Sequence, residues 1–137
     1  KVLFEKMNLD FNDDFNGKPL IETLLTPTNI YVKTFKALKD KIVAMAHITG
    51  GGIVENLPRV LPENLRAEVK KDSIKTLPIF DLISKHVDED EMYRAFNMGV
   101  GMILVVEEKD VDFVLSNAEG SYLIGKIVEG DREAVMV

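Results

Sequence analysis

The 137-residue chain has a globular balance of 46% hydrophobic and 29% charged residues, and its formal net charge of -6 argues against nucleic-acid and anionic-membrane binding. The absence of cysteine excludes disulfides, thiol nucleophiles and Cys-ligated zinc, and with two histidines a His-rich metal site is not expected. No apolar run approaches the ~20 residues that a membrane span needs.

The first part of the chain predicts two helices and one strand. Residues 1–8 have a helical apolar pattern but no cap before it, so we expect the chain to be part of a longer protein. A polar loop is predicted over residues 10–17, which contain Asn-Asp-Asp and Asn-Gly. A second helix is expected over residues 30–39 with Thr28 as its N-cap. The apolar run Ile42–Ile48 then predicts a strand.

This strand runs into three successive glycines, Gly50, Gly51 and Gly52, and a short segment of helical character follows. The order of strand, glycine turn and helix start directs several backbone N–H groups and the positive end of a helix dipole at one point. Such a point suits a phosphate or another anion. A sharp bend alone would also explain the glycines, so both interpretations stay open at this stage.

Polar residues around the glycine turn favour ligand binding there. His47 lies at the carboxyl end of the predicted strand, where open α/β sheets place ligands, and is a candidate for orienting a substrate or moving a proton. The alternative is that His47 is a structural residue. Thr49 is expected to hold a phosphate together with the glycine amides. Asn56 and Arg59 are candidates for binding polar groups of a substrate.

The second half of the chain predicts further strands and helices in alternation. Strands are expected at residues 65–69, 102–106, 122–128 and 134–137, and helices from Pro78, Asp88 and Asp110. The continuous apolar run Met102–Val106 indicates a strand that is buried on both faces or central in the sheet. Asn97 comes just before Gly99, where a left-handed helix end is expected, and is predicted to line the same cleft as the glycine turn.

This order of elements predicts one α+β domain spanning residues 1–137. Two β-α-β units with a helical insertion indicate a mixed, partly ferredoxin-like sheet. The helices near residues 1–8 and 30–39 would cover its other face, which gives three layers, α/β/α.

Four strings of the sequence together resemble one known family. They are LTPTNIYVK at Leu25–Lys33, AHITGGG at Ala46–Gly52, ENLPRVLP at Glu55–Pro62 and MYRAFNMGVGM at Met92–Met102. In this order they closely resemble the C-terminal half of the aminoimidazole ribonucleotide synthetases, also called phosphoribosylformylglycinamidine cyclo-ligases. That family usually has Arg, Thr and often Cys where Asn29, Ala95 and Met98 stand, so we assign no chemistry to these three positions.

The resemblance implies an ATP-dependent cyclo-ligase of purine biosynthesis, which converts formylglycinamidine ribonucleotide to aminoimidazole ribonucleotide in the cytoplasm. It implies ATP and Mg²⁺ as cofactors of the full-length enzyme, with neither bound tightly by this part alone. It also implies an N-terminal ATP-binding domain that forms a homodimer and faces this C-terminal domain across the cleft for the phosphate-bearing substrate. We therefore expect the 137 residues alone to be inactive.

Two alternatives remain open at the level of sequence. One is a ferredoxin-like regulatory module that binds a small metabolite. The other is a sister enzyme with the same two-domain plan, such as formylglycinamidine synthetase or selenophosphate synthetase. The strings Pro-Thr-x-Ile-Tyr-Val-Lys and Arg-x-Phe-Asn favour the cyclo-ligase.

Overall fold

The strands form three small sheets in the computed structural model, which describes all residues 1–137. The strands are β1 (Asp14–Phe15), β2 (Lys18–Pro19), β3 (Ile42–His47), β4 (Leu65–Val69), β5 (Met102–Val106), β6 (Gly125–Glu129) and β7 (Ala134–Met136). β1 pairs with β2, and β3 with β5, both antiparallel. β4 lies between β6, which is antiparallel to it, and β7, which is parallel to it.

The helices between these strands are all short. They are α1 (Leu20–Leu24), α2 (Val32–Leu38), α3 (Gly52–Asn56), α4 (Pro78–Ser84), α5 (Glu89–Ala95) and α6 (Val111–Asn117), with single turns η1 (Val2–Lys6), η2 (Leu57–Val60), η3 (Lys71–Ser73) and η4 (Glu108–Asp110). None of them has both the length and the apolar character to cross a membrane. The mixture of helices and mainly antiparallel strands confirms the predicted α+β class.

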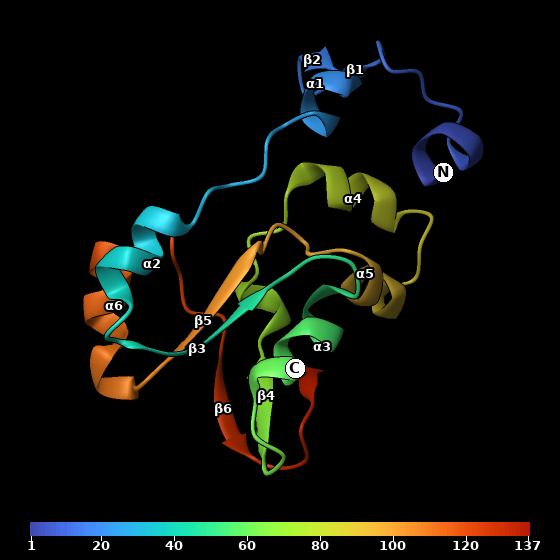
Figure 1. Ribbon diagram of the computed structural model, residues 1–137. Helices are drawn as coiled ribbons and strands as arrows, with labels where there is room; N and C mark the ends of the chain where they lie inside the picture. Colours follow the sequence, from blue (N-terminus) through green and yellow to red (C-terminus); the bar gives the residue numbers. More distant parts are fainter.

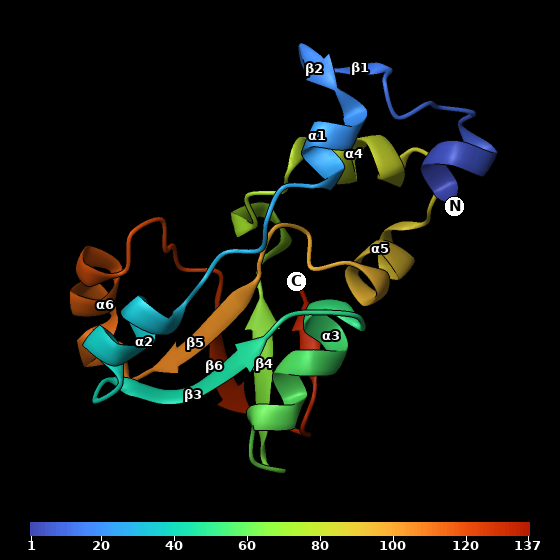
Figure 2. The same cartoon turned by 45° about the horizontal axis from the view of Figure 1, so that its top comes forward.

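Strand β5 is covered on both faces, as its continuous apolar run predicts. Ile103 and Val105 pack toward the main hydrophobic core, whereas Leu104 and Val106 pack toward a second cluster around Leu38. Successive residues of a strand point to opposite faces, so a strand without polar residues can serve two cores. Figures 1 and 2 show the result: α2 and α6 lie together on one side of β3 and β5, and α3 and α5 lie on the other.

The two cores differ in what they join. The main core connects β3, α3 and α5 through the fully buried residues Ile48, Ile53 and Met92. The second core holds α2 against α6 through Leu38, Val114 and Ala118. Burial of a Leu, Ile or Met side chain contributes roughly 1.5–3 kcal/mol. The carboxyl end of β3 is therefore fixed mainly by the core that also contains α3 and α5.

Residues 10–17, predicted as a loop, contain the first strand and the turn of a small β-hairpin. Asn16 and Gly17 have φ angles of 55° and 82° and connect β1 to β2. Two left-handed residues are what a tight two-residue hairpin needs, and Asn-Gly is the pair that adopts them most readily. The Asn-Gly signal was thus correctly placed in a turn, but the hairpin around it was not predicted.

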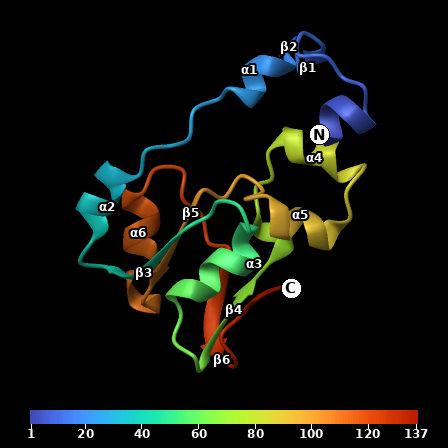
Figure 3. The same ribbon diagram turned by 45° about the vertical axis from the view of Figure 1, so that its right-hand side comes forward.

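The prediction that Thr28 caps the second helix is wrong. Helix α2 begins at Val32, and Tyr31 occupies its N-cap position. Figures 1 and 3 show that the chain between α1 and α2 is extended. The ring of Tyr31 lies against the backbone of Gly101, far away in the sequence. This tertiary contact lies at the beginning of α2, and sequence propensity does not include it.

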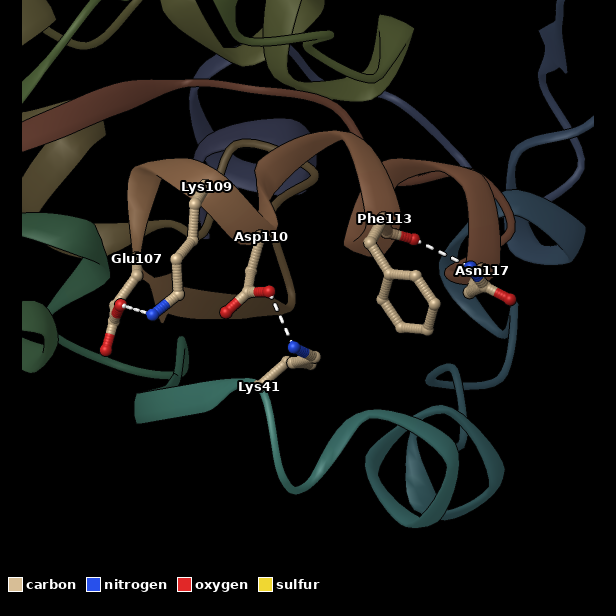
Figure 4. Close-up of polar contacts among 6 residues, drawn as sticks. All are labelled: Lys41, Glu107, Lys109, Asp110, Phe113 and Asn117. Carbon is tan, nitrogen blue, oxygen red and sulfur yellow. Dashed lines mark hydrogen bonds and ion pairs between the residues drawn. The ribbon is translucent and has the colours of Figure 1, made fainter.

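Asp88 and Asp110 are N-cap residues as predicted, but neither side chain makes a capping hydrogen bond. Asp110 instead accepts a hydrogen bond from Lys41 Nζ at 2.7 Å, with the ammonium 5.8 Å from the centre of the Phe113 ring. Figure 4 shows Lys41 reaching from the start of β3 to the start of α6. This ion pair therefore ties the strand to the helix that covers it.

Candidate functional site

The glycine turn joins the end of β3 to the start of α3 by a chain of backbone hydrogen bonds. Ile48 N donates to Gly101 O at 3.0 Å, just beyond the last paired residues His47 and Met102. Gly52 N then donates to Thr49 O at 3.0 Å and closes a tight turn. Strand, turn and helix thus follow one another as the sequence predicts.

Asn56 holds the glycine turn in shape from inside the protein. It is the one polar residue among the buried ones, and its Nδ2 donates to Gly50 O at 3.1 Å and to Gly52 O at 2.8 Å. A buried amide group must find such partners, because an unpaired one costs about 1–3 kcal/mol. Asn56 is thus a support of the turn, and its donor group faces backbone carbonyls.

Three successive backbone amides of the turn have no protein partner. The N–H groups of Thr49, Gly50 and Gly51 donate to no backbone or side-chain acceptor, and Thr49 and Gly50 are exposed. Unpaired amides at the start of a helix attract anions. The turn therefore leaves the predicted amides of Gly50 and Gly51 free, together with that of Thr49, whereas the predicted Gly52 amide is not free because it donates to Thr49 O.

The three glycines have different surroundings. A Cβ at Gly50 would meet no atom within 4 Å, so this position opens to solvent. Gly51 has φ 95°, and a Cβ there would lie 2.6 Å from Oε2 of Glu55. Gly52 is buried and has φ 58°, and a Cβ added there would collide with the carbonyl oxygen of Tyr93. Gly52 therefore serves packing, and Gly50 leaves room for a ligand.

A negative charge already lies beside the turn. The Glu55 carboxylate belongs to an exposed side chain of α3 and lies over Gly51. A like charge opposes anion binding, although a flexible surface side chain can move aside. A phosphate bound at the turn therefore has to displace the Glu55 carboxylate or share a cation with it.

The structure places two more of the predicted residues near the turn. His47 is exposed at the end of β3, opposite Met102. Asn97 directly follows Phe96, whose carbonyl oxygen would lie 2.8 Å from a Cβ at Gly52. The Oδ1 atom of Asn97 accepts a hydrogen bond from Gly99 N at 3.0 Å. Its amide nitrogen donates to no protein group and is free for a ligand.

No hydrogen bond or ion pair joins the Arg59 side chain to the turn. It lies exposed on η2, makes no ion pair, and is separated from the glycines by α3. Arg59 is therefore an unpaired cation at the surface, on the helical turn that directly follows α3. Of the predicted residues, the hydrogen bonds bring together Thr49, Gly50, Gly52 and Asn56.

Tyr31 lies at the same strand end and was not predicted as a site residue. A Cβ at Gly101 would collide with the Tyr31 hydroxyl, and the carbonyl of Gly101 is the acceptor for Ile48 N. The only signal in the sequence is the glycine at position 101 next to an apolar strand, since a glycine there can mark a close approach by another group. The sequence does not say that the group is Tyr31.

The chain has no cluster of metal-binding side chains, since nowhere do three or more His, Cys, Asp or Glu residues come together in a way that could hold an ion. Burial raises the pKa of Tyr93, whose backbone carbonyl packs against Gly52 in the turn. The site therefore consists of unpaired amides, one exposed imidazole, the amide of Asn97 and the carboxylate of Glu55.

Comparison with known proteins now adds to this geometry. Residues 2–137 match the family described as AIR synthase related protein, C-terminal domain. The chain belongs to this family. The match covers all four sequence strings and the glycine turn, so it confirms the resemblance on which the sequence-based prediction rests.

Individual members of the AIR synthase related family are similar over almost the whole chain. A phosphoribosylformylglycinamidine cyclo-ligase of Thermoanaerobacter sp. (strain X514) is 46% identical over 99% of this chain and 43% of its own length. Proteins of the same name from Staphylococcus carnosus and Bacillus velezensis are 42% and 43% identical, over 98% and 96% of this chain. The chain therefore spans less than half the length of these curated relatives.

Proposed function

We propose that this chain is the C-terminal, substrate-cleft domain of an ATP-dependent cyclo-ligase that converts formylglycinamidine ribonucleotide to aminoimidazole ribonucleotide. The observation that carries the proposal is the set of three unpaired amides at Thr49, Gly50 and Gly51, in a chain 46% identical to a protein named for this reaction. The name of that relative favours the cyclo-ligase over a regulatory module and over the sister enzymes.

In this proposal the turn binds a phosphate of the ribonucleotide or of ATP. Preorganised amides stabilise the negative charge of a phosphate without having to reorient, and positioning with electrostatic stabilisation dominates phosphoryl transfer. Gly50 leaves the approach open, and Asn56 fixes the carbonyls on the inner side of the turn. In this proposal His47, exposed at the end of β3, orients the substrate or moves a proton.

The proposed cofactors are ATP and Mg²⁺, and the residues of this chain fit them unequally. The free amides suit a phosphate of ATP. No group of carboxylates suits a metal ion, so we assign Mg²⁺ to no residue of this chain. An N-terminal domain in the remaining length of the protein is the proposed source of ATP and metal binding and of the homodimer contact, in a cytoplasmic enzyme.

The finer architecture belongs to the same proposal. Residues 1–137 are proposed to form one domain with three layers, α/β/α, around a ferredoxin-like sheet. In support, α2 and α6 contact one face of β5 and the core with α3 and α5 contacts the other. The β3–β5 sheet and the β6–β4–β7 sheet are, however, not hydrogen-bonded to each other.

Substitution of Gly50 by leucine in the full-length protein tests the phosphate site. The new side chain enters open space at a position without positive φ, so folding should be unaffected while the approach to the amides is blocked. Loss of charge-assisted hydrogen bonds should raise the KM of one phosphate-bearing reactant by about 10–100-fold. Steady-state kinetics with the ribonucleotide and ATP varied separately shows which of the two binds there.

A matched control is Ser116→Leu, which adds the same side chain at an exposed position of α6, on the other side of β3 and β5. It should leave both KM values unchanged. If Gly50→Leu leaves both KM values at the wild-type level while the protein stays folded, the phosphate site at the turn is wrong.

A further inference from the structure

The hydroxyl of Tyr31 has no hydrogen-bond partner within the chain, although its ring is held in place. Among the tyrosines, the Tyr122 hydroxyl accepts a hydrogen bond from Lys75 N at 3.3 Å, and Tyr31 has no such contact. Tyr31 is half-buried, whereas its neighbours Ile30 and Val32 are 84% and 55% exposed. The chain therefore turns Tyr31 inward and leaves both neighbouring apolar side chains in solvent.

Two contacts anchor Tyr31. The carbonyl oxygen of Tyr31 accepts a hydrogen bond from Phe35 N at 2.9 Å. Tyr31 is the N-cap of α2, so this bond closes the first turn of the helix. Its ring lies on Gly101, where any side chain would collide with the hydroxyl. Because Gly101 has no positive φ angle, the approach of Tyr31 is the steric reason for glycine at this position.

These contacts bring the hydroxyl to the beginning of the glycine turn. Gly101 is hydrogen-bonded through its carbonyl to Ile48 N, and Ile48 is followed directly by Thr49, the first of the three unpaired amides. His47, on the other side of Ile48, is exposed at the same strand end. The phenol of Tyr31 and three unpaired amide donors thus lie where β3 ends, from two segments far apart in the sequence.

We infer that Tyr31 is a substrate-binding residue, which donates its hydroxyl proton in a hydrogen bond to a phosphate or ribose oxygen of the ligand held at Thr49–Gly51. This inference rests on the proposed function, because it needs a phosphate-bearing ligand at the turn. A half-buried phenol with a fixed ring provides a donor at little cost in conformational entropy. Tyr31 therefore fixes the orientation of a ligand that the amides alone would hold only by its charge.

The test is Tyr31→Phe in the full-length protein. Phenylalanine keeps the ring on Gly101 and removes only the hydroxyl, so the melting temperature should stay the same. Loss of one hydrogen bond should raise the KM of the reactant bound at the turn by about 3–10-fold with kcat changed less than about twofold. The control Tyr122→Phe removes a hydroxyl that contacts Lys75 and should leave KM unchanged.

A second pair of variants tests the contact itself. Gly101→Ala introduces a methyl group against the Tyr31 hydroxyl and should lower the melting temperature. The same change in a Tyr31→Phe background should lower it less, because the colliding oxygen is gone. Equal losses in the two backgrounds would show that Tyr31 does not lie on Gly101 and would overturn the inference.

The kinetic outcomes separate this inference from the proposed function. If Gly50→Leu raises a KM and Tyr31→Phe does not, the role of Tyr31 is wrong and the phosphate site stands. If neither variant changes any KM, both are wrong. A rise in the same KM for both variants supports the two together.

Discussion

Gly50 and Gly52 stand two residues apart and have opposite surroundings. A methyl group at Gly50 meets nothing within 4 Å, whereas at Gly52 it meets the carbonyl oxygens of Tyr93 and Phe96. Gly52 also has a φ angle of 58°, which an alanine adopts only at a cost. At the scale of single residues, the glycine string therefore combines an open position for a ligand with a closed position for packing.

The pair of variants Gly50→Ala and Gly52→Ala measures this difference. Gly52→Ala should lower the free energy of unfolding by about 2–4 kcal/mol, from left-handed strain and overpacking together. Gly50→Ala should change it by less than about 1 kcal/mol, since surface changes of this kind have small effects. Denaturant unfolding of both variants checks the prediction. Similar losses at the two positions would contradict the packing role of Gly52.

At the scale of elements, the site depends on β3 and β5, and side chains of β5 pack toward the main core on one face and toward the cluster around Leu38 on the other. α2 and α6 cover one face of this pair, and the Lys41–Asp110 ion pair fixes the start of β3 to α6 (Figure 4). The side chains of Lys41 and Asp110 are 40% and 14% exposed. The pair is thus half in solvent, and screening by water limits its contribution.

A double-mutant cycle with Lys41→Ala and Asp110→Asn measures that contribution. We expect a coupling of about 0.5 kcal/mol in the free energy of unfolding, which falls as salt is added. The pair Lys109–Glu107 is a suitable control, because its side chains are 72% and 58% exposed and it lies within one turn. No coupling is expected for the control. A coupling for Lys41–Asp110 that does not respond to salt would argue against a charge interaction.

At the scale of the whole molecule, the chain supplies hydrogen-bond donors and no cluster of metal ligands. It presents unpaired amides, an exposed His47 and the Tyr31 hydroxyl, but no group of side chains able to hold a metal ion. The curated relatives are more than twice as long, since this chain covers 43% of the first of them. In the proposed function the remaining length supplies the parts that handle ATP and metal.

The isolated 137-residue chain should therefore fold and yet catalyse nothing. We expect one cooperative thermal transition, because the main core extends from η1 to β7. No ATP-dependent formation of aminoimidazole ribonucleotide is expected from the chain alone, whereas the full-length protein should form it. Turnover by the isolated chain in a product assay would show that its own residues are sufficient.

Local patterns in the sequence determined much of this protein. The apolar runs of β3 and β5, the Pro78 start of α4 and the glycine turn all follow from periodicity and backbone chemistry within a few residues, and the structure confirms them. Membership of the AIR synthase related family likewise rests on strings of adjacent residues. Because these features depend on neighbours along the chain, the order of residues is enough to predict them.

Only the tertiary structure decided how these pieces are used. The glycine required at position 101 and the placement of Tyr31 depend on one contact across about 70 residues of sequence, and α2 begins directly after Tyr31. Asn56 supports the turn because its side chain faces the carbonyls of Gly50 and Gly52. Gly52 is needed for packing because the carbonyls of two α5-region residues lie against it. Packing between segments that are distant in the sequence decides which groups face these residues. The type of a residue and its spacing from its neighbours carry no information about such distant groups.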